Sequence, residues 1–356
     1  MPTHPLAPYD ALVVLSFGGP EAPDEVMPFL RRVTAGRGIP DDRLTEVAEH
    51  YLLFGGVSPI NAQNRALVAA LAAELQARHA SVPVHLANRN TQPFAEEVLA
   101  GLTPGRILVI LTSGLRSYSS CRQYREDLAR AADAGLIVDK IASYAEHPAV
   151  LDATTHLTAT ALAPILADDP AGHVLTVAHS LPLQMDASSG PAQEGGHAYS
   201  AALARVSAHL HSRLSERFGR PVPVDLTYCS RSGPPRVPWL GPGVGERLEQ
   251  LADAGVTTVL LAPIGFVSDH MEVRYDLDTE ARAQAEALGI RLERAPTLGI
   301  DPRFVSALAD LAFARAAEAR GESSSVPQCP PPTCPADCCP NPRGELATRC
   351  AADVAA

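Results

Sequence analysis

The chain has 356 residues, of which 46% are apolar, and a formal net charge of −11 at pH 7. This length and apolar content are enough for two globular domains, each with a buried core of its own. No basic tract offsets the negative charge, so the electrostatic attraction that drives binding to nucleic acid or to an anionic membrane is missing. An anionic ligand would have to be held by a local cluster of basic residues.

Four short apolar runs, each bounded by Gly, Pro or Ser, predict buried parallel strands. They cover residues 11–16 (ALVVLS), 107–112 (ILVILT), 173–178 (HVLTVA) and 257–262 (TTVLLA). Residues 64–79 carry apolar side chains with the spacing of one helix face, and residues 302–320 form an Ala-rich helix that ends before Gly321. Alternation of strands and helices is typical of an α/β doubly wound fold.

The pattern along the chain predicts three segments. The two halves each begin with a buried strand, which predicts an N-terminal α/β lobe over residues 1–160 and a C-terminal α/β lobe over residues 161–321. The remaining tail, residues 322–356, is rich in Ser, Pro and Cys and too poor in apolar residues to form a core, so it needs an external organiser. No run approaches the roughly 18 to 20 uninterrupted apolar residues of a membrane span, and the N-terminus does not resemble a signal peptide. We therefore expect a cytoplasmic protein with no stable membrane association.

In an open α/β sheet, ligands bind beyond the carboxyl ends of the strands, so the segments that follow the apolar runs are the place to look for a site. The segment after the fourth run carries Glu272, Asp276 and Glu280 at four-residue intervals. In an α-helix, a four-residue step advances about 400°, so the three carboxylates share one face. Such a stripe is either a solvated acidic face or a track for a hard or borderline divalent cation.

His179 directly follows the third apolar run, where a side chain can point into a crevice. A histidine there is either a structural residue or a group that binds a transition metal or accepts a proton near neutral pH. The sequence has no G-x-x-x-x-G-K-[ST], H-E-x-x-H or G-x-S-x-G motif, and Gly241, Gly243 and Gly245 lack the context of a dinucleotide fingerprint. What remains is a metal-handling site that uses no nucleotide.

Five segments stand in a specific order and spacing: SFGGP (16–20), EHYLLFGGVSPIN (49–61), TVAHSLP (176–182), SRSGPPRVPWLGP (230–242) and PIGFVSDHMEVRYDLDTE (263–280). Together they resemble the ferrochelatase family over about residues 8–320, and the actinobacterial branch in particular, whose members are similar to coproporphyrin ferrochelatases. The most specific parts are AHSLP and GF-x-x-D-H-x-E-x-x-Y-D-x-D. The resemblance implies two Rossmann-like lobes with parallel sheets, a porphyrin in the cleft between them, and a lyase-class enzyme that inserts Fe²⁺ in haem biosynthesis.

The resemblance also implies roles for individual positions. His179 and Glu272 match the family's two iron-site residues, and we expect His179 to accept a pyrrole proton and contact iron while Glu272 binds iron beside it. Asp276 and Glu280 match an acidic line that delivers the metal. Porphyrin contacts are expected from Ser58, Tyr124, Phe17, His50 and Tyr51. Because Phe17 stands where some Gram-positive relatives place an iron-ligating tyrosine, tyrosine ligation is not expected here.

The resemblance to the actinobacterial branch, together with the absence of an apolar membrane-facing insertion, predicts coproporphyrin III as substrate and Fe-coproporphyrin III (coproheme) as product. Candidate partners for its propionates are Arg31, Arg32, Arg37 and Arg231, for each of which a solvated surface role is an alternative. Two other functions stay open: a cobalt or nickel chelatase of a related tetrapyrrole, since the same ligands accept several divalent ions, and a haem carrier without chemistry. The expected partners are the porphyrin, ferrous iron and enzymes of the haem pathway.

Five of the seven cysteines lie in the tail, which in a reducing compartment indicates metal ligands rather than disulfides. Cys329, Cys334 and Cys339 recur at five-residue intervals, and structural zinc or a reactive disordered tail are alternatives. Cluster-bearing ferrochelatases take one thiolate from an internal position similar to Cys121 and three from the C-terminus. The resemblance therefore implies a 2Fe-2S cluster on Cys121, Cys329, Cys334 and Cys339, with Cys338 as a substitute for its neighbour and Cys350 as a bystander.

Overall fold

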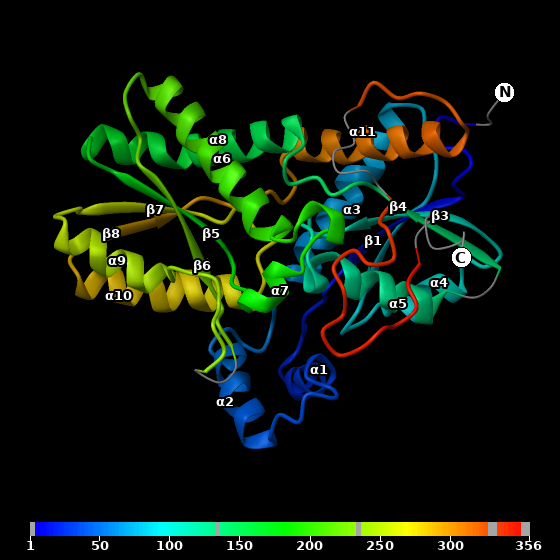
Figure 1. Ribbon diagram of the computed structural model, residues 1–356, viewed down its shortest axis with the longest axis horizontal. Coiled ribbons are helices and arrows are strands. Elements are labelled where there is room, and N and C mark those ends of the chain that lie inside the picture. Colours follow the sequence, from blue (N-terminus) through cyan, green and yellow to red (C-terminus); the bar gives the residue numbers. More distant parts are fainter. Residues whose placement is uncertain (1–3, 133–134, 233–235, 327–332, 350–356) are drawn as a thin grey trace.

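The computed structural model describes residues 4–132, 135–232, 236–326 and 333–349. Its strands form two parallel four-stranded sheets, with the strand orders β2-β1-β3-β4 and β6-β5-β7-β8. Figure 1 shows the two sheets side by side, with helices packed around them and α1 and α2 projecting to one side. The α/β fold with two parallel sheets that the sequence predicts is therefore confirmed.

The bounds of the elements are as follows. The strands are β1 (Ala11–Ser16), β2 (Val84–Asn88), β3 (Gly105–Leu111), β4 (Leu136–Lys140), β5 (His173–His179), β6 (Val224–Cys229), β7 (Thr258–Ala262) and β8 (Arg291–Arg294). The α-helices are α1 (Val26–Val33), α2 (Asp41–Leu52), α3 (Ile60–Ala77), α4 (Ala95–Ala100), α5 (Gln123–Ala131), α6 (Pro148–Asp168), α7 (Leu183–Ala187), α8 (Ala198–Phe218), α9 (Val244–Asp253), α10 (Ala281–Ala287) and α11 (Pro302–Ala319). The remaining helical segments are the 3₁₀ turns η1 (Pro23–Glu25) and η3 (Ala192–Glu194) and the π-helices η2 (Tyr118–Arg122) and η4 (Val273–Glu280).

The four strands predicted from the sequence are the two central strands of each sheet, β1, β3, β5 and β7. Each agrees with its apolar run to within two residues. A central strand is buried on both faces, so its sequence is a continuous apolar run. The four edge strands escape the prediction because they carry polar or charged side chains, as in VHLAN of β2 and RLER of β8.

The core of the first sheet is closed by helices from both ends of the chain. Leu67 of α3 and Phe304 and Leu308 of α11 pack with Leu12 and Val14 of β1 in one buried cluster. Figure 1 shows α11 lying along α3 over the first sheet. The last helix thus covers the sheet built from the first part of the chain, while the predicted division into lobes at residue 160 stays a prediction.

In the described parts of the chain, α6 is the helix that by length and composition alone could cross a membrane. A core helix passes the same test, and α6 packs inside the protein. Val150 joins the core of the first sheet, whereas Leu162 and Ile165 pack with Val174 and Leu260 of the second. This helix therefore contributes to the cores of both sheets.

Candidate active site

Two residues singled out from the sequence lie together beyond the second sheet. His179 is the last residue of β5, and Glu272 directly precedes η4, the π-helix that follows β7. Because β5 and β7 are adjacent and parallel, the segments after their carboxyl ends meet at one edge of the sheet. Nε2 of His179 lies 3.4 Å from Oε2 of Glu272, and the side chains are 34% and 50% exposed. The pair is therefore accessible from solvent.

The hydrogen bonds of His179 fix which ring nitrogen faces the site. Nδ1 lies 2.5 Å from the carbonyl oxygen of Ser180, and because a carbonyl only accepts, Nδ1 is the donor and Nε2 is left toward Glu272. Burial lowers the pKa of His179, but the neighbouring Glu272 carboxylate outweighs it and the pKa is raised overall. Burial opposes the ionisation of Glu272, yet His179 and His270 bring the pKa of Glu272 down to about 2. Glu272 is therefore a carboxylate at physiological pH, and it stabilises a proton on Nε2.

His270 is a third group at this point, one that the sequence reasoning missed. Its Nδ1 lies 3.9 Å from Oε2 of Glu272, and its ring packs edge-on against Phe266 with centroids 5.0 Å apart. Burial lowers the pKa of His270, which favours the neutral imidazole. Its position in the D-H-x-E segment, two residues before Glu272, was the available signal.

Asp276 and Glu280 lie on η4, a π-helix and not the α-helix that the four-residue spacing suggests. Hydrogen bonds from i to i+5 widen the turn, so a four-residue step falls short of a full turn instead of passing it. The carboxylates still influence one another, since burial and the charges of Glu272 and Glu280 raise the pKa of Asp276 to about 7. Ser230, whose backbone is left-handed with φ 61°, donates a hydrogen bond to Asp276. Glu280 is exposed.

A family model described as Ferrochelatase matches residues 9–316. The chain belongs to the ferrochelatase family. It is 47% identical over 329 residues to the coproporphyrin III ferrochelatase of Streptomyces coelicolor, a match that covers 89% of this chain and 88% of that protein. The coproporphyrin III ferrochelatase of Streptomyces griseus is also 47% identical, over 331 residues, with the same coverage. Among solved structures, SirB from Bacillus subtilis with Fe³⁺ matches with a TM-score of 0.48 at 15% identity, over 90% of this chain and 99% of that one.

In this ferrochelatase-family chain, three of the expected porphyrin contacts belong to one aromatic cluster. The guanidinium of Arg89 lies 5.8 Å from the ring centroid of Phe17 and 4.7 Å from that of Tyr124. Phe29 packs against both Phe17 and Tyr51, with centroids 6.0 and 5.8 Å apart. The structure therefore brings Phe17 and Tyr124 together at Arg89, a cation that the sequence reasoning did not consider, and links Tyr51 to Phe17 through Phe29.

The other two expected contacts, His50 and Ser58, have different neighbours. His50 of α2 stacks on Tyr275 of η4, with centroids 3.8 Å apart and ring planes 9° apart. Burial and the charges of Glu272 and Asp276 raise the pKa of Tyr51. Tyr51 of α2 therefore lies near enough to these two carboxylates to be affected by their charge. Ser58 is buried, and a Cβ added at Gly19 would lie 2.6 Å from its Cβ, so the loop after β1 packs tightly against it.

The candidate propionate partners are of two kinds. Three have other contacts: Arg31 pairs with Asp41, Arg231 pairs with Glu246, and Arg32 lies over the ring of Phe94. Arg37 differs, because burial and the positive charges of Arg343 and Arg89 lower its pKa. Cations that crowd one another in this way are stabilised by an anion placed among them. Arg343 comes from the tail, which the sequence reasoning assigned only to cysteine chemistry.

The structure gathers four cysteines. Cys121 lies on η2, and Cys334, Cys338 and Cys339 form a buried cluster in the tail. The neighbouring Cys334 thiol and burial raise the pKa of Cys121, and the sulfurs of Cys338 and Cys339 are 3.7 Å apart. Hydrogen bonds from Cys121 and Cys338 lower the pKa of Cys334. Among the described residues, no group of three or more His, Cys, Asp or Glu side chains already has the arrangement of a metal site. Cys329 and Cys350 lie outside the described residues.

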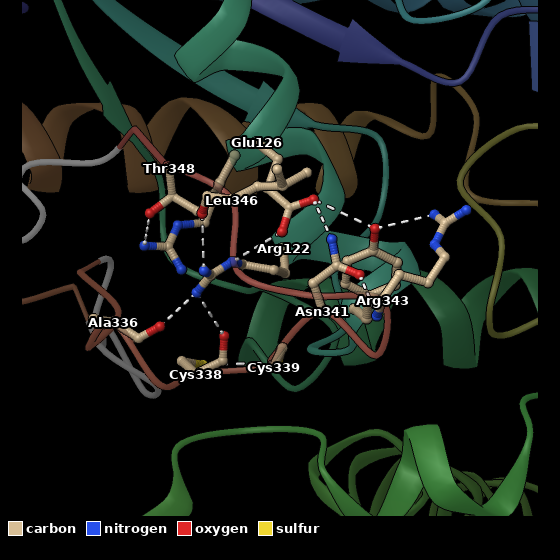
Figure 2. A network of polar contacts seen from close by, with 11 residues as sticks. Arg122, Glu126, Ala336, Cys338, Cys339, Asn341, Arg343, Leu346 and Thr348 are labelled. Atoms are coloured by element: carbon tan, nitrogen blue, oxygen red, sulfur yellow. Dashed lines mark hydrogen bonds and ion pairs between the residues drawn. The ribbon is translucent and has the colours of Figure 1, made fainter. Parts of the chain in front are cut away.

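Buried polar contacts hold residues 333–349 of the tail against η2 and α5, as Figure 2 shows. The guanidinium of Arg122 donates to the carbonyl oxygens of Ala336, Cys338 and Leu346, at 2.5, 3.5 and 3.3 Å. Arg122 also pairs with Glu126, which accepts a hydrogen bond from Asn341 at 3.2 Å. Charged side chains of the body therefore act as an organiser for a tail that is poor in apolar residues.

Proposed function

We propose that this protein inserts Fe²⁺ into coproporphyrin III, releasing two protons and forming coproheme, as a lyase-class chelatase of haem biosynthesis. The observation that carries the proposal is the His179–Glu272 pair, with Nε2 and Oε2 3.4 Å apart at the strand ends of a chain that the family model matches over residues 9–316. The substrate is supported by relatives 47% identical that are named coproporphyrin III ferrochelatases.

The pair divides the work of insertion between a base and a metal ligand. With Nδ1 held by the carbonyl of Ser180, Nε2 of His179 is the atom that takes a pyrrole proton, and the Glu272 carboxylate stabilises the imidazolium that results. Glu272, ionised at physiological pH, offers a hard oxygen ligand to Fe²⁺. With Glu272 as the protein ligand, the other coordination positions of the iron stay open to the four ring nitrogens.

Asp276 and Glu280 form the delivery path in this proposal. Glu280 is exposed and meets the cation first, and Asp276 lies between it and the iron site on η4. Repulsion among adjacent carboxylates is one cause of the raised pKa of Asp276, and a divalent cation relieves that repulsion. The path therefore attracts Fe²⁺ where the carboxylates are most crowded.

The aromatic cluster and the arginines suit a flat, anionic ligand. Phe17 and Tyr51 are partly exposed aromatic side chains, while Arg37 and Arg343 supply positive charge in a protein of net charge −11. Tyr124 is buried, so it supports this cluster from below. Arg37 is the strongest of the four propionate candidates, because the others already have partners. A porphyrin with four carboxylates gains more from such a cluster than one with two.

Anaerobic assays of Fe²⁺ insertion, run side by side with coproporphyrin III and protoporphyrin IX, test this function. We expect a clearly higher kcat/KM with coproporphyrin III, and an Arg37→Gln variant that loses part of that preference. Co²⁺ and Ni²⁺ competition distinguishes a chelatase for another metal. A protein that binds coproheme tightly but inserts no iron into the free base would be a carrier, and the proposal would be wrong.

We also propose that the four gathered cysteines hold a 2Fe-2S cluster, with Cys338 as the fourth ligand in place of Cys329. The fit is supported by burial of all four thiols, by the N–H of Gly190 donating to the sulfur of Cys339 at 3.1 Å, and by the positive charge of Lys140 and Arg125 near Cys334. The N–H and the two cations favour the thiolates of Cys334 and Cys339, whose pKa values are lowered, whereas burial and neighbouring thiols raise the pKa values of Cys121 and Cys338. Thiolates are the ligands of such clusters, so binding would have to release the protons of the latter two. A bound cluster would supply thiolate bonds that cross-link the tail to η2.

Anaerobic purification followed by visible spectroscopy and by iron and sulfide analysis tests the cluster. Cys121→Ser and Cys338→Ser should lose the chromophore, whereas Cys329→Ser should keep it. A colourless protein that contains zinc, or a cluster unaffected by Cys121→Ser, contradicts the ligand set. A cytoplasmic location and haem-pathway enzymes as partners stay predictions.

A further inference from the structure

Tyr199, which has no role in the proposed mechanism, holds the main chain of His179 in place. The hydroxyl of Tyr199 donates a hydrogen bond to the carbonyl oxygen of His179 at 2.8 Å. On the side of β7, the pairing of β5 ends at Thr176, three residues before His179. On the side of β6 the pairing continues to His179, opposite Cys229, so the carbonyl that faces β7 is the one that needs a partner, and a buried side chain supplies it. Tyr199 is 2% exposed, so its ring is fixed by packing.

The backbone of Tyr199 is in turn held by residues 186–190, at and after the end of α7. It lies in the first turn of α8, and its backbone N–H donates to Oγ of Ser189 at 3.0 Å. Ser189 is fully buried, and its hydroxyl donates to the carbonyl oxygen of Asp186 at 2.7 Å. The position of the Tyr199 hydroxyl therefore follows the position of residues 186–190.

Cys339 of the tail forms hydrogen bonds with this same segment. The N–H of Gly190 donates to Sγ of Cys339, and the N–H of Cys339 donates to the carbonyl oxygen of Gly190, each at 3.1 Å. Gly190 has φ 88°, and a Cβ there would lie 2.8 Å from Cβ of Ala198, at the start of α8. The tail, Gly190 and the first turn of α8 are therefore closely packed against one another.

From these contacts we infer that Tyr199 is a positioning residue for His179, and that Cys339 sets its place through Gly190 and Ser189. The cysteine pocket and the iron site are thereby coupled through one run of hydrogen bonds and close packing. The inference rests on the proposed role of His179. A base displaced from its partner atom lowers the limiting rate more than it weakens substrate binding, because the interaction is made in the transition state.

Tyr199→Phe removes the hydroxyl and leaves the ring. We expect its kcat for Fe²⁺ insertion to fall by about tenfold, with KM for porphyrin and for iron changed less than about twofold. Tyr228→Phe is the matched control, since Tyr228 is a buried tyrosine of the same hydrophobic cluster, on β6. A kcat for Tyr199→Phe equal to that of the control would overturn the positioning role.

The coupling to the tail is tested in metal-free protein, by hydrogen exchange of the backbone amides of residues 186–200. Cys339→Ala should speed exchange of the Tyr199 amide by about tenfold, whereas Cys338→Ala, which removes a neighbouring thiol without touching Gly190, should leave it unchanged. If the Tyr199 amide exchanges at the same rate in both variants, Cys339 does not set the position of Tyr199. Two further proteins separate the two levels: if the unsubstituted protein inserts no iron the proposed function fails, and if His179→Ala is inactive while Tyr199→Phe is fully active, only this inference fails.

Discussion

The iron-site residues and the cysteine pocket are built in opposite ways. His179 ends a central strand of a sheet whose core is apolar on both faces, so the hydrophobic core sets its position. The cysteines of the tail have no such core beneath them and are placed by Arg122, Glu126 and the backbone of Gly190. The iron site is held rigid by the hydrophobic core, whereas the cysteine pocket depends on a few polar and charged contacts.

This difference determines how each site fails. Loss of one partner in a buried ion-paired network leaves the other charge unpaired, so the cysteine pocket should open as a unit. Substitution of an accessible ligand at the end of a strand removes its chemistry and leaves the sheet intact. Substitution of His179 or Glu272 should therefore lower activity and leave stability nearly unchanged, whereas substitution of Arg122 should first lower the stability of the docked tail.

The largest effect is expected at the iron site. His179→Ala and Glu272→Ala should each lower the rate of Fe²⁺ insertion by at least about 100-fold, because loss of a general base or of a metal ligand removes the step itself. The circular dichroism spectrum and Tm should stay close to those of the unsubstituted protein. Glu286→Ala, on the exposed surface of α10, is the control and should be fully active. Normal turnover by a folded Glu272→Ala protein would contradict the assignment of the site.

The next effect is expected at the tail. The side chains of Arg122 and Glu126 are only 8% and 4% exposed, so Arg122→Ala leaves a buried carboxylate without its cation and removes the donor to three carbonyl groups of the tail. We expect a local cost of about 3 to 5 kcal/mol, enough to undock residues 333–349. Limited proteolysis should then cut the tail first and leave the body intact. Arg130→Ala, on the following helix α5 and 72% exposed, should be cut no faster than the unsubstituted protein. A protected tail in Arg122→Ala would show that other contacts hold it.

The same contrast explains what the sequence could predict of the fold. Continuous apolar runs revealed β1, β3, β5 and β7, since double-sided burial forces such sequences. The edge strands could not be found by that signal, because one side of each meets solvent or loops. The π-helix was also out of reach, since a four-residue acidic spacing fits an α-helix as well, and the choice depends on packing.

Of the site, the sequence identified the groups that carry charge and missed those that hold them in place. His179, Glu272 and Asp276 follow buried strands or share a motif, which a single sequence shows. Ser230 and Tyr199 act through a hydroxyl whose target lies 46 and 20 residues away along the chain, so no local pattern marks them. Cys338 was treated as a substitute, and its place in the pocket depends on the tertiary fold.

Asp276→Asn tests the acidic path through stability. The pKa of this carboxyl is about 7 in the folded protein and 3.8 for an ordinary aspartate, so the folded state binds its proton more tightly. Stability from Asp276 therefore falls as pH rises from about 4 to 7, and asparagine avoids that loss. We expect Asp276→Asn to be more stable by about 2 to 4 kcal/mol at pH 8 and nearly unchanged at pH 4, measured by urea unfolding. The half-saturating Fe²⁺ concentration should rise several-fold. A uniform stability change across pH would contradict the raised pKa.

The smallest effect is expected at Glu280, the exposed end of the series. An exposed carboxylate attracts a cation through water and is screened by salt, so it speeds capture without contributing to the insertion step. Glu280→Ala should raise the half-saturating Fe²⁺ concentration by about two- to threefold and leave kcat unchanged. Because the attraction is long-range, the difference from the unsubstituted protein should shrink as ionic strength rises from about 0.01 to 0.3 M, where the Debye length falls from about 30 Å to below 10 Å. Glu286→Ala removes the same charge from α10 and should show neither effect. If the defect of Glu280→Ala persists unchanged at high salt, or appears in kcat, Glu280 ligates iron during insertion and is part of the inner site.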